Sequence, residues 1–233
     1  MALKKKKLNS KDARRKLVTA VDPKSPISEQ YRTIRTNIQF SSVDKEIRAI
    51  MVTSSGPGEG KSTTAANLAV TFAQLGTKVL LVDADLRKPT VHHTFGINNL
   101  FGFTTVLTKQ KTLEKTVLET EVQDLFILTS GPIPPNPAEL IGSKSMEQFL
   151  EDAKSQFEYI IFDTPPLLAV ADSQILANQC DGSIMVVYSE RTEIEPAKKA
   201  KELLANAQSK LLGVVLNHKE AKSGDYYYYY GAK

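Results

Sequence analysis

The sequence predicts an α/β domain in which a mostly parallel sheet is covered by helices on both faces. Short apolar runs alternate with stretches of helical periodicity through most of the 233 residues, which is typical of parallel sheets with crossover helices. A glycine-rich turn follows one apolar run and acidic residues follow two others. Open α/β sheets bind ligands at such positions.

The composition limits the class of protein. A single Cys180 excludes an intrachain disulfide and fits a reducing cytoplasm; we interpret it as a small buried residue. No apolar run reaches the roughly 18 residues that a membrane span requires. No apolar segment follows the Lys-rich N-terminus, so a signal peptide is not expected either.

The net charge of +4 is unevenly distributed. Residues 1–16 carry eight basic side chains and one acidic one, a net +7, so the remaining 217 residues sum to −3. We expect residues 1–24 to be a basic, flexible arm that ends in a linker over 18–24. A solvated tail and attraction to anionic lipid or an acidic partner both remain open. No nucleic acid is expected, because no reading motif accompanies the charge.

The first predicted helix begins at Ser25 and Pro26, a typical N-cap followed by proline at the first position. Its apolar face should pack on the domain; the face consists of Ile27, Tyr31, Ile34 and Ile38. A separate stripe holds Glu29, Arg32 and Arg35. Charges spaced in this way usually form a solvated face, which is our first interpretation of the stripe.

Residues 50–63 are the central motif. Ile50–Val52 predict a buried strand, and a helix is expected from Ser62 to about Leu75, where Gly76 ends it. Between them lies a glycine-rich turn whose N–H groups can converge on an anion beside the helix dipole. Lys61 can reach the β- and γ-phosphates, and the Ser62 hydroxyl can ligate Mg²⁺. The fold is therefore expected to be P-loop NTPase-like. Ser55 replaces the first glycine of the strict pattern, and a simple turn before a surface helix is the alternative for the loop alone.

The rest of the chain continues the alternation. Further strands are expected at 79–82, 125–128, 159–162, 183–188 and 211–216. Helices are expected near Leu107 and at 112–119, 138–156, 171–179 and 193–206. Residues 131–137 include four prolines and predict a stiff loop. We place the domain at 25–217 and a flexible Tyr-rich tail at 218–233.

Three carboxylates follow the predicted strands beside the phosphate loop: Asp83, Asp85 and Asp163. A carboxylate after a buried strand can simply cap the next helix, which is the alternative for each one alone. Three that converge on a phosphate loop instead fit a Mg²⁺–nucleotide site, because phosphoryl transfer needs a held metal and an oriented nucleophile.

With these motifs, residues 25–230 resemble the bacterial tyrosine kinases (BY-kinases) of capsule and exopolysaccharide synthesis. Residues 55–63 look like their Walker A loop, 79–87 like Walker A′ with its D-x-D-x-R, and 160–165 like Walker B. Glu29, Arg32 and Arg35 match the family's oligomerisation motif E-x-x-R-x-x-R, which replaces our first interpretation of that stripe. The run at 134–140 and the tyrosine cluster are also family-like.

The resemblance implies a role for each matching residue. The phosphate loop would hold ATP; its residues are Ser55, Gly56, Pro57, Gly58, Glu59, Gly60, Lys61, Ser62 and Thr63. Asn217, after the last predicted strand, resembles the adenine-contacting Asn of related ATPases and would also contact ATP. Mg²⁺ would be ligated by Ser62, Asp85 and Asp163. Lys61, Asp83 and Asp85 would be catalytic, with Asp83 orienting or deprotonating the tyrosine hydroxyl, although the division between Asp83 and Asp85 stays open. A phenol of pKa about 10 benefits from a carboxylate acceptor.

The resemblance further implies autophosphorylation of the C-terminal cluster, Tyr226, Tyr227, Tyr228, Tyr229 and Tyr230. Thirteen residues from Asn217 span about 40 Å when extended, enough to reach another subunit. Full modification adds a charge of about −8 to −10, which opposes packing of neighbouring tails. We expect a homo-oligomer through the 29–35 helix, other protein substrates, and activation by a membrane adaptor's cytoplasmic tail. The protein would then be cytoplasmic and peripheral at the inner face of the plasma membrane.

Two alternatives share this fold. Positioning or partition ATPases carry a second lysine early in the loop, where this chain has Gly56. A nucleotide-dependent scaffold without kinase activity is disfavoured by the intact Lys61 and acidic residues. A eukaryotic-type kinase is excluded, because no H-R precedes Asp85 and no D-F-G follows it.

Overall fold

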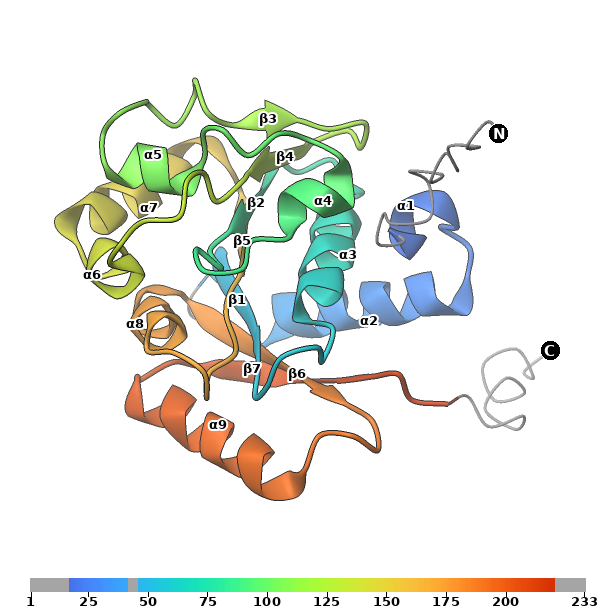
Figure 1. Ribbon diagram of the computed structural model, residues 1–233. Helices are drawn as coiled ribbons and strands as arrows, with labels where there is room; N and C mark the ends of the chain where they lie inside the picture. Colours follow the sequence, from blue (N-terminus) through green and yellow to red (C-terminus); the bar gives the residue numbers. More distant parts are fainter. Residues whose placement is uncertain (1–16, 42–45, 221–233) are drawn as a thin grey trace, which may run out of the picture.

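The computed structural model describes residues 17–41 and 46–220. Within these ranges, strands form one sheet in the order β3-β4-β2-β5-β1-β6-β7, parallel except for the antiparallel pair β3 and β4 (Figure 1). The strands are β1 Ala49–Ser54, β2 Val79–Asp83, β3 Leu118–Glu119, β4 Leu125–Leu128, β5 Tyr159–Asp163, β6 Gly182–Tyr188 and β7 Leu211–Asn217. The mostly parallel sheet predicted from the alternating pattern is confirmed.

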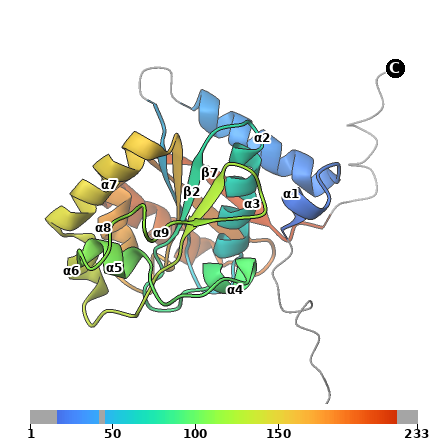
Figure 2. The same ribbon diagram turned by 90° about the horizontal axis from the view of Figure 1, so that it is seen from above.

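Helices cover both faces of this sheet, as the sequence predicted (Figures 1 and 2). Helices α1 to α4 lie on one side and α5 to α9 on the other. Their bounds are α1 Val18–Val21, α2 Pro26–Phe40, α3 Lys61–Ala73, α4 Val91–Phe95, α5 Phe103–Leu107, α6 Pro137–Ile141, α7 Lys144–Gln156, α8 Asp172–Gln179 and α9 Ile194–Asn206. The inner strands β1 and β2 are buried along their whole length, because side chains on both of their faces contact helices.

The helix predicted from Ser25 is α2, and its N-cap is confirmed: the Ser25 hydroxyl accepts the Ser28 N–H at 3.2 Å. Its apolar face packs in part. Ile38 is buried and Ile34 packs against the core, whereas Ile27 at the other end is half-exposed. No helix in 17–41 or 46–220 is long and apolar enough to cross a membrane.

The linker expected over 18–24 begins instead with the short helix α1, which packs on α3. Thr19 is fully buried there, and both its N–H and its hydroxyl donate to Asn67 Oδ1, at 3.1 and 2.9 Å. The Gln74 side chain donates to the Thr19 carbonyl at 2.9 Å. Sequence patterns over four residues cannot reveal such a helix, because its stability comes from tertiary contacts.

One further local prediction was wrong, and another was incomplete. The helix expected over 112–119 is a turn followed by β3, and α4 was not predicted. The helical stretch expected over 138–156 is divided at Gly142 and Ser143 into α6 and α7. Strand β3 lies at the edge of the sheet, where packing outweighs weak local preference.

Candidate active site

The phosphate loop joins β1 to α3. Gly58 and Gly60 have φ of 78° and 95°, a left-handed conformation that favours glycine. Gly60 is the N-cap of α3, so the loop leads directly into a helix N-terminus with its free N–H groups and positive dipole end. The structure thus provides the geometry for binding an anion that the sequence motif predicted.

Ser55, which departs from the strict motif, contributes to closing the loop. Its N–H and hydroxyl donate to the buried Glu59 carboxylate at 2.9 and 2.7 Å, and the Gly56 N–H donates to it at 3.2 Å. The Thr192 hydroxyl donates to the same carboxylate at 2.7 Å. Glu59 therefore braces the loop from within and ties it to the segment after β6. Direct nucleotide contacts by Ser55, Gly56, Pro57 and Glu59 stay a prediction.

Lys61 lies where the acidic residues converge. Its Nζ is 3.4 Å from Asp85 Oδ2, 3.9 Å from Asp163 Oδ1 and 3.4 Å from the Ser62 hydroxyl. This convergence follows from the strand order, because β2, β5 and β1 are neighbours whose carboxyl ends meet at one edge. Four of the residues predicted to hold the phosphates and the metal are thus brought together.

Asp83 is placed beside Asp163 by the register of β2 and β5, but it is fully buried and has a second role. Its Oδ2 accepts the N–H groups of Thr90 and Val91, both at 2.9 Å, at the start of α4. The alternative considered for each carboxylate alone, that it caps the next helix, therefore holds for Asp83. Oδ1 is buried without a hydrogen-bond partner. The pKa of Asp83 is raised to about 8, mainly because the carboxyl group is buried and secondly because of the charge of Asp163. The two N–H bonds act in the opposite direction and lower it.

The donor set fits Mg²⁺. Among the described residues no group of three or more His, Cys, Asp or Glu is arranged to hold a metal ion. Mg²⁺ in phosphoryl-transfer sites, however, takes one or two carboxylates and completes its shell with water and substrate phosphates. The Ser62 hydroxyl and the carboxylates of Asp85 and Asp163 are hard oxygen ligands of that kind.

Asn217 lies at the end of β7 and contacts the loop itself: its Nδ2 donates to the Glu59 carbonyl at 3.0 Å. Nearby, the rings of Tyr188 and His218 stack at 4.3 Å between centroids, and the Arg191 guanidinium lies 5.4 Å from the Tyr188 ring. Sequence reasoning missed these neighbours, because separated residues at the ends of β6 and β7 form no motif. Contact of Asn217 with a nucleobase stays a prediction.

Arg87, inside the D-x-D-x-R motif, forms a bidentate ion pair that the sequence did not predict. Its Nε and Nη2 donate to Asp172 at 2.7 and 3.1 Å. These hydrogen bonds raise the pKa of Arg87. The motif indicated that Arg87 matters, but nothing in the sequence identified Asp172 as its partner.

The predicted oligomerisation stripe lies along α2. Glu29 and Arg32 form an ion pair, and Arg32 Nη2 also donates to the Pro23 carbonyl at 2.6 Å. Arg35 Nη1 donates to the Thr71 carbonyl of α3 at 2.7 Å. Arg35 is thus tied to its own domain, and an intersubunit role for the stripe stays a prediction. Tyr226 to Tyr230 lie outside the described residues.

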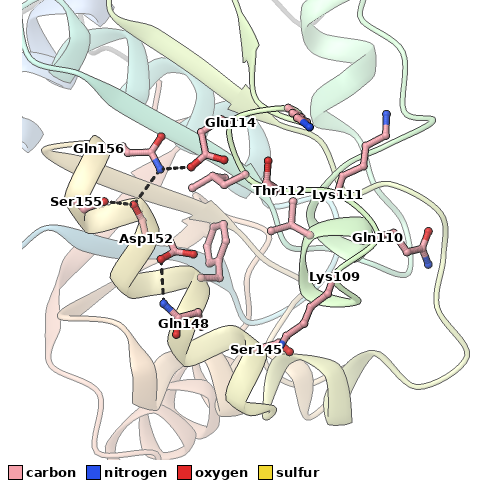
Figure 3. A pocket seen from close by; sticks show the side chains of 14 residues that line it. Lys109, Gln110, Lys111, Thr112, Glu114, Ser145, Gln148, Asp152, Ser155 and Gln156 are labelled. Atoms are coloured by element: carbon pink, nitrogen blue, oxygen red, sulfur yellow. Dashed lines mark hydrogen bonds between the residues drawn. The ribbon is translucent and has the colours of Figure 1, made fainter.

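A cavity of about 740 Å³ lies between α7 and the segment after α5 (Figure 3). Its polar wall includes Gln156, which donates to Glu114 at 3.1 Å, and Gln148, which donates to Asp152 at 3.0 Å. None of the predicted site residues lines it, so it is not part of the candidate active site.

Comparison with known proteins agrees with this geometry. A family model described as "ParA: NUBPL iron-transfer P-loop NTPase" matches residues 46–226. The chain is 54% identical over 233 residues to the tyrosine-protein kinase YwqD of Bacillus subtilis, covering 100% of this chain and 98% of that protein. It is 42% identical over 210 residues to the putative tyrosine-protein kinase CapB of Staphylococcus aureus, covering 90% and 92%.

Solved structures give the same result. The chimerical protein CapA2B2 superposes with a TM-score of 0.85 at 44% identity, covering 88% of this chain and 90% of that one. The kinase domain of the Escherichia coli tyrosine kinase ETK gives 0.82 at 26% identity, covering 95% and 87%. The chain therefore belongs to the P-loop NTPases and, within them, to the bacterial tyrosine kinases (BY-kinases) of the capsule family, and it is a protein-tyrosine kinase.

Proposed function

We propose that this kinase transfers the γ-phosphoryl group of ATP, bound with Mg²⁺, to the tyrosines of its own C-terminal cluster and to other proteins, and thereby regulates capsule or exopolysaccharide synthesis and export. The observation that carries the proposal is the convergence of Lys61, Asp85 and Asp163 beside the phosphate loop. Phosphoryl transfer requires a positioned triphosphate, charge neutralisation and an oriented acceptor. Each requirement has a residue at this site.

The N–H groups of residues 58–63 and the amino group of Lys61 would hold the phosphates. Ser62, Asp85 and Asp163 would hold Mg²⁺, which neutralises phosphate charge when bound. Asp85 belongs to this side of the site because it lies 3.4 Å from Lys61. Enclosure of the carboxylates strengthens these electrostatic interactions, since little water competes with them.

Asp83 would receive the proton of the acceptor. The tyrosine oxygen forms a bond to the γ-phosphorus, the bond from that phosphorus to the bridging oxygen breaks, and ADP leaves. The hydroxyl proton passes to the Asp83 carboxylate. The raised pKa of Asp83, about 8, makes its carboxylate a stronger base than that of an ordinary aspartate, and the positive charge of Mg²⁺, when bound, would favour the deprotonated form that accepts the proton. The unpartnered Oδ1 supports the same role.

The tail of one subunit would be phosphorylated by another subunit of an oligomer assembled through Glu29, Arg32 and Arg35. Modified tails then carry enough charge to separate the subunits. The cytoplasmic tail of a membrane adaptor would activate the kinase and hold it at the inner face of the plasma membrane. Residues 1–16 carry a net +7, which favours this placement beside anionic lipid.

The test is incubation of the purified protein with ATP and Mg²⁺, with and without adaptor tail fragments, followed by mass spectrometry of the C-terminal peptide. Lys61→Met and Asp83→Asn should abolish tail phosphorylation. Lys198→Met is the matched control, because Lys198 forms only an exposed ion pair with Glu195 on α9. It should behave as the wild type.

The proposal would be supported if phosphate appears on Tyr226 to Tyr230 in the wild type and in the control but in neither Lys61→Met nor Asp83→Asn. ATP hydrolysis with an unmodified tail, even with a competent adaptor, would contradict it and favour a positioning ATPase. An alanine triple variant at Glu29, Arg32 and Arg35 that still forms the full oligomer would contradict the assembly step.

A further inference from the structure

A buried carboxylate outside every predicted motif lies close to the catalytic edge of the sheet. Asp172 is the first residue of α8, nine positions after Asp163, and its side chain is 1% exposed. A charge buried to this degree needs a partner. Arg87 supplies it through two hydrogen bonds of 2.7 and 3.1 Å, the bidentate geometry in which guanidinium and carboxylate interact most strongly.

The ion pair joins the two chain segments that carry the carboxylates predicted to ligate the metal, Asp85 and Asp163. Arg87 follows Asp85 by two residues after β2, and Asp85 Oδ1 accepts the Lys88 N–H at 2.9 Å. The Asp85 carboxylate is thus held in a turn that contains Arg87. The position of the Asp85 carboxylate therefore depends on the conformation of this turn.

The other segment is fixed in the same way. The Ser173 hydroxyl, next to Asp172, donates to the Pro165 carbonyl at 2.6 Å, which anchors the start of α8 to the residues just after Asp163. At the base of both segments the Ala84 N–H donates to the Asp163 carbonyl at 2.8 Å. The Arg87–Asp172 pair connects the same two segments a second time, beyond the ends of β2 and β5.

We propose that Asp172 is a positioning residue: through Arg87 it fixes Asp85 relative to Asp163 and Lys61, and so sets the affinity for Mg²⁺ with nucleotide. The inference rests on the proposed ATP–Mg²⁺ site. Asp172 does not touch the reacting atoms. Residues that orient metal ligands without binding the metal change its affinity by about 10- to 100-fold when they are mutated, and Asp172 has that relation to Asp85.

The unequal burial of the partners predicts unequal effects of mutation. Arg87 is 45% exposed, so water can solvate its guanidinium when Asp172 is changed to Asn. Replacing Arg87 by Met instead leaves the carboxylate buried and unpaired, which is the more damaging change. Arg87→Lys keeps the charge but loses the bidentate geometry. Its effect should lie between no change and the effect of Arg87→Met.

The experiment titrates a fluorescent, non-hydrolysable ATP analogue into the full chain, first in EDTA and then at graded Mg²⁺ concentrations. In Asp172→Asn the Mg²⁺ concentration for half-maximal binding should rise about 10-fold, with the Mg²⁺-free affinity unchanged within about twofold. In Arg87→Met the rise should be larger, and the double variant should be no worse than Arg87→Met, because both changes break one interaction.

Asp181→Asn is the matched control. Asp181 pairs with Lys154 and accepts the Arg48 and Ala49 N–H groups at the start of β1, the opposite end of the sheet from the ligands. This variant should lower Tm without changing the Mg²⁺ dependence. Comparing the Tm of all variants thus separates a general loss of stability from misplacement of Asp85.

An unchanged Mg²⁺ dependence in Asp172→Asn would overturn the inference while leaving the kinase function intact. Additive effects of Asp172→Asn and Arg87→Met would also overturn it, since they would mean that the two residues act separately. If nucleotide binding by the wild type itself does not depend on Mg²⁺, the proposed ATP–Mg²⁺ site fails, and the inference fails with it.

Discussion

Gly60 is the position at which a single methyl group should disturb the phosphate loop most directly. Its φ is +95°, and a Cβ added there would lie 1.9 Å from Asn217 Nδ2. That Nδ2 donates to the Glu59 carbonyl at 3.0 Å. In Gly60→Ala the Asn217 side chain must therefore move away and give up this hydrogen bond.

The expected loss of stability has two parts. Alanine in a left-handed conformation costs about 1–2 kcal/mol, and the lost hydrogen bond costs about 0.5–1.5 kcal/mol. Together they lower the free energy of unfolding by about 1.5–3.5 kcal/mol. For a domain of this size, Tm should fall by about 3–14 °C.

Gly76→Ala separates the two parts. Gly76 has a φ of +77°, and an added Cβ would meet nothing within 4 Å, so only the backbone strain should appear. The effect of alanine on the unfolded chain is common to both variants and cancels in the comparison. Gly60→Ala should also bind ATP more weakly in a fluorescence titration, whereas Gly76→Ala should bind it as the wild type does.

The double variant Gly60→Ala, Asn217→Ala tests the contact itself. Because the second change removes the atom that the methyl group would meet, the combined loss of stability should be smaller than the two single losses added. Equal Tm losses for Gly60→Ala and Gly76→Ala, together with unchanged nucleotide binding, would refute this reasoning.

Three further predictions concern other residues of the domain. The pKa of Asp83, about 8 in the folded protein and near 3.8 when unfolded, means that the native state holds a proton which the unfolded state releases. Its contribution to stability is present below pH 3.8 and is lost as pH rises through 8. Asp83→Asn should accordingly raise Tm relative to the wild type at pH 8 more than at pH 5 in metal-free buffer; an equal difference at both pH values would contradict this. Thr19→Val removes a buried hydroxyl that donates to α3 and should lower the free energy of unfolding in urea by about 1–2 kcal/mol, while deletion of residues 1–16 should leave it unchanged. An added Cβ at Gly102 would lie 2.1 Å from a backbone oxygen, whereas one at Gly213 would meet nothing within 4 Å. Gly102→Ala should therefore lower the free energy of unfolding in urea by about 3 kcal/mol or more. Gly213→Ala should lower it far less.

Much of the site could be predicted because its motifs are local. The loop from Ser55 to Thr63 and the carboxylates after β2 and β5 are short runs whose chemistry can be read residue by residue. In a parallel sheet these runs meet at one edge, so their convergence followed from the fold class. The described strands other than β3 were predicted well for a related reason: continuous apolar runs bounded by turns have few other stable arrangements in water.

The contacts that join distant segments could not be predicted in the same way. Helix α1, the cap that Asp83 provides for α4, the brace between Glu59 and Thr192, and the pair of Arg87 with Asp172 each link residues whose meeting depends on the packed structure. A polar residue has many possible partners until packing excludes most of them, and no spacing in the sequence encodes that choice.

The sequence by itself thus determined the fold class, the nucleotide loop and the acidic residues of this kinase, because each depends on local composition or periodicity. Only the tertiary structure decided how those residues are held. It buried Asp83 and raised its pKa, filled the space beside Gly60 with Asn217, and bound the Asp85 segment to α8. The physical reason is that burial and bidentate pairing are properties of neighbours in space, which the chain acquires only when it packs.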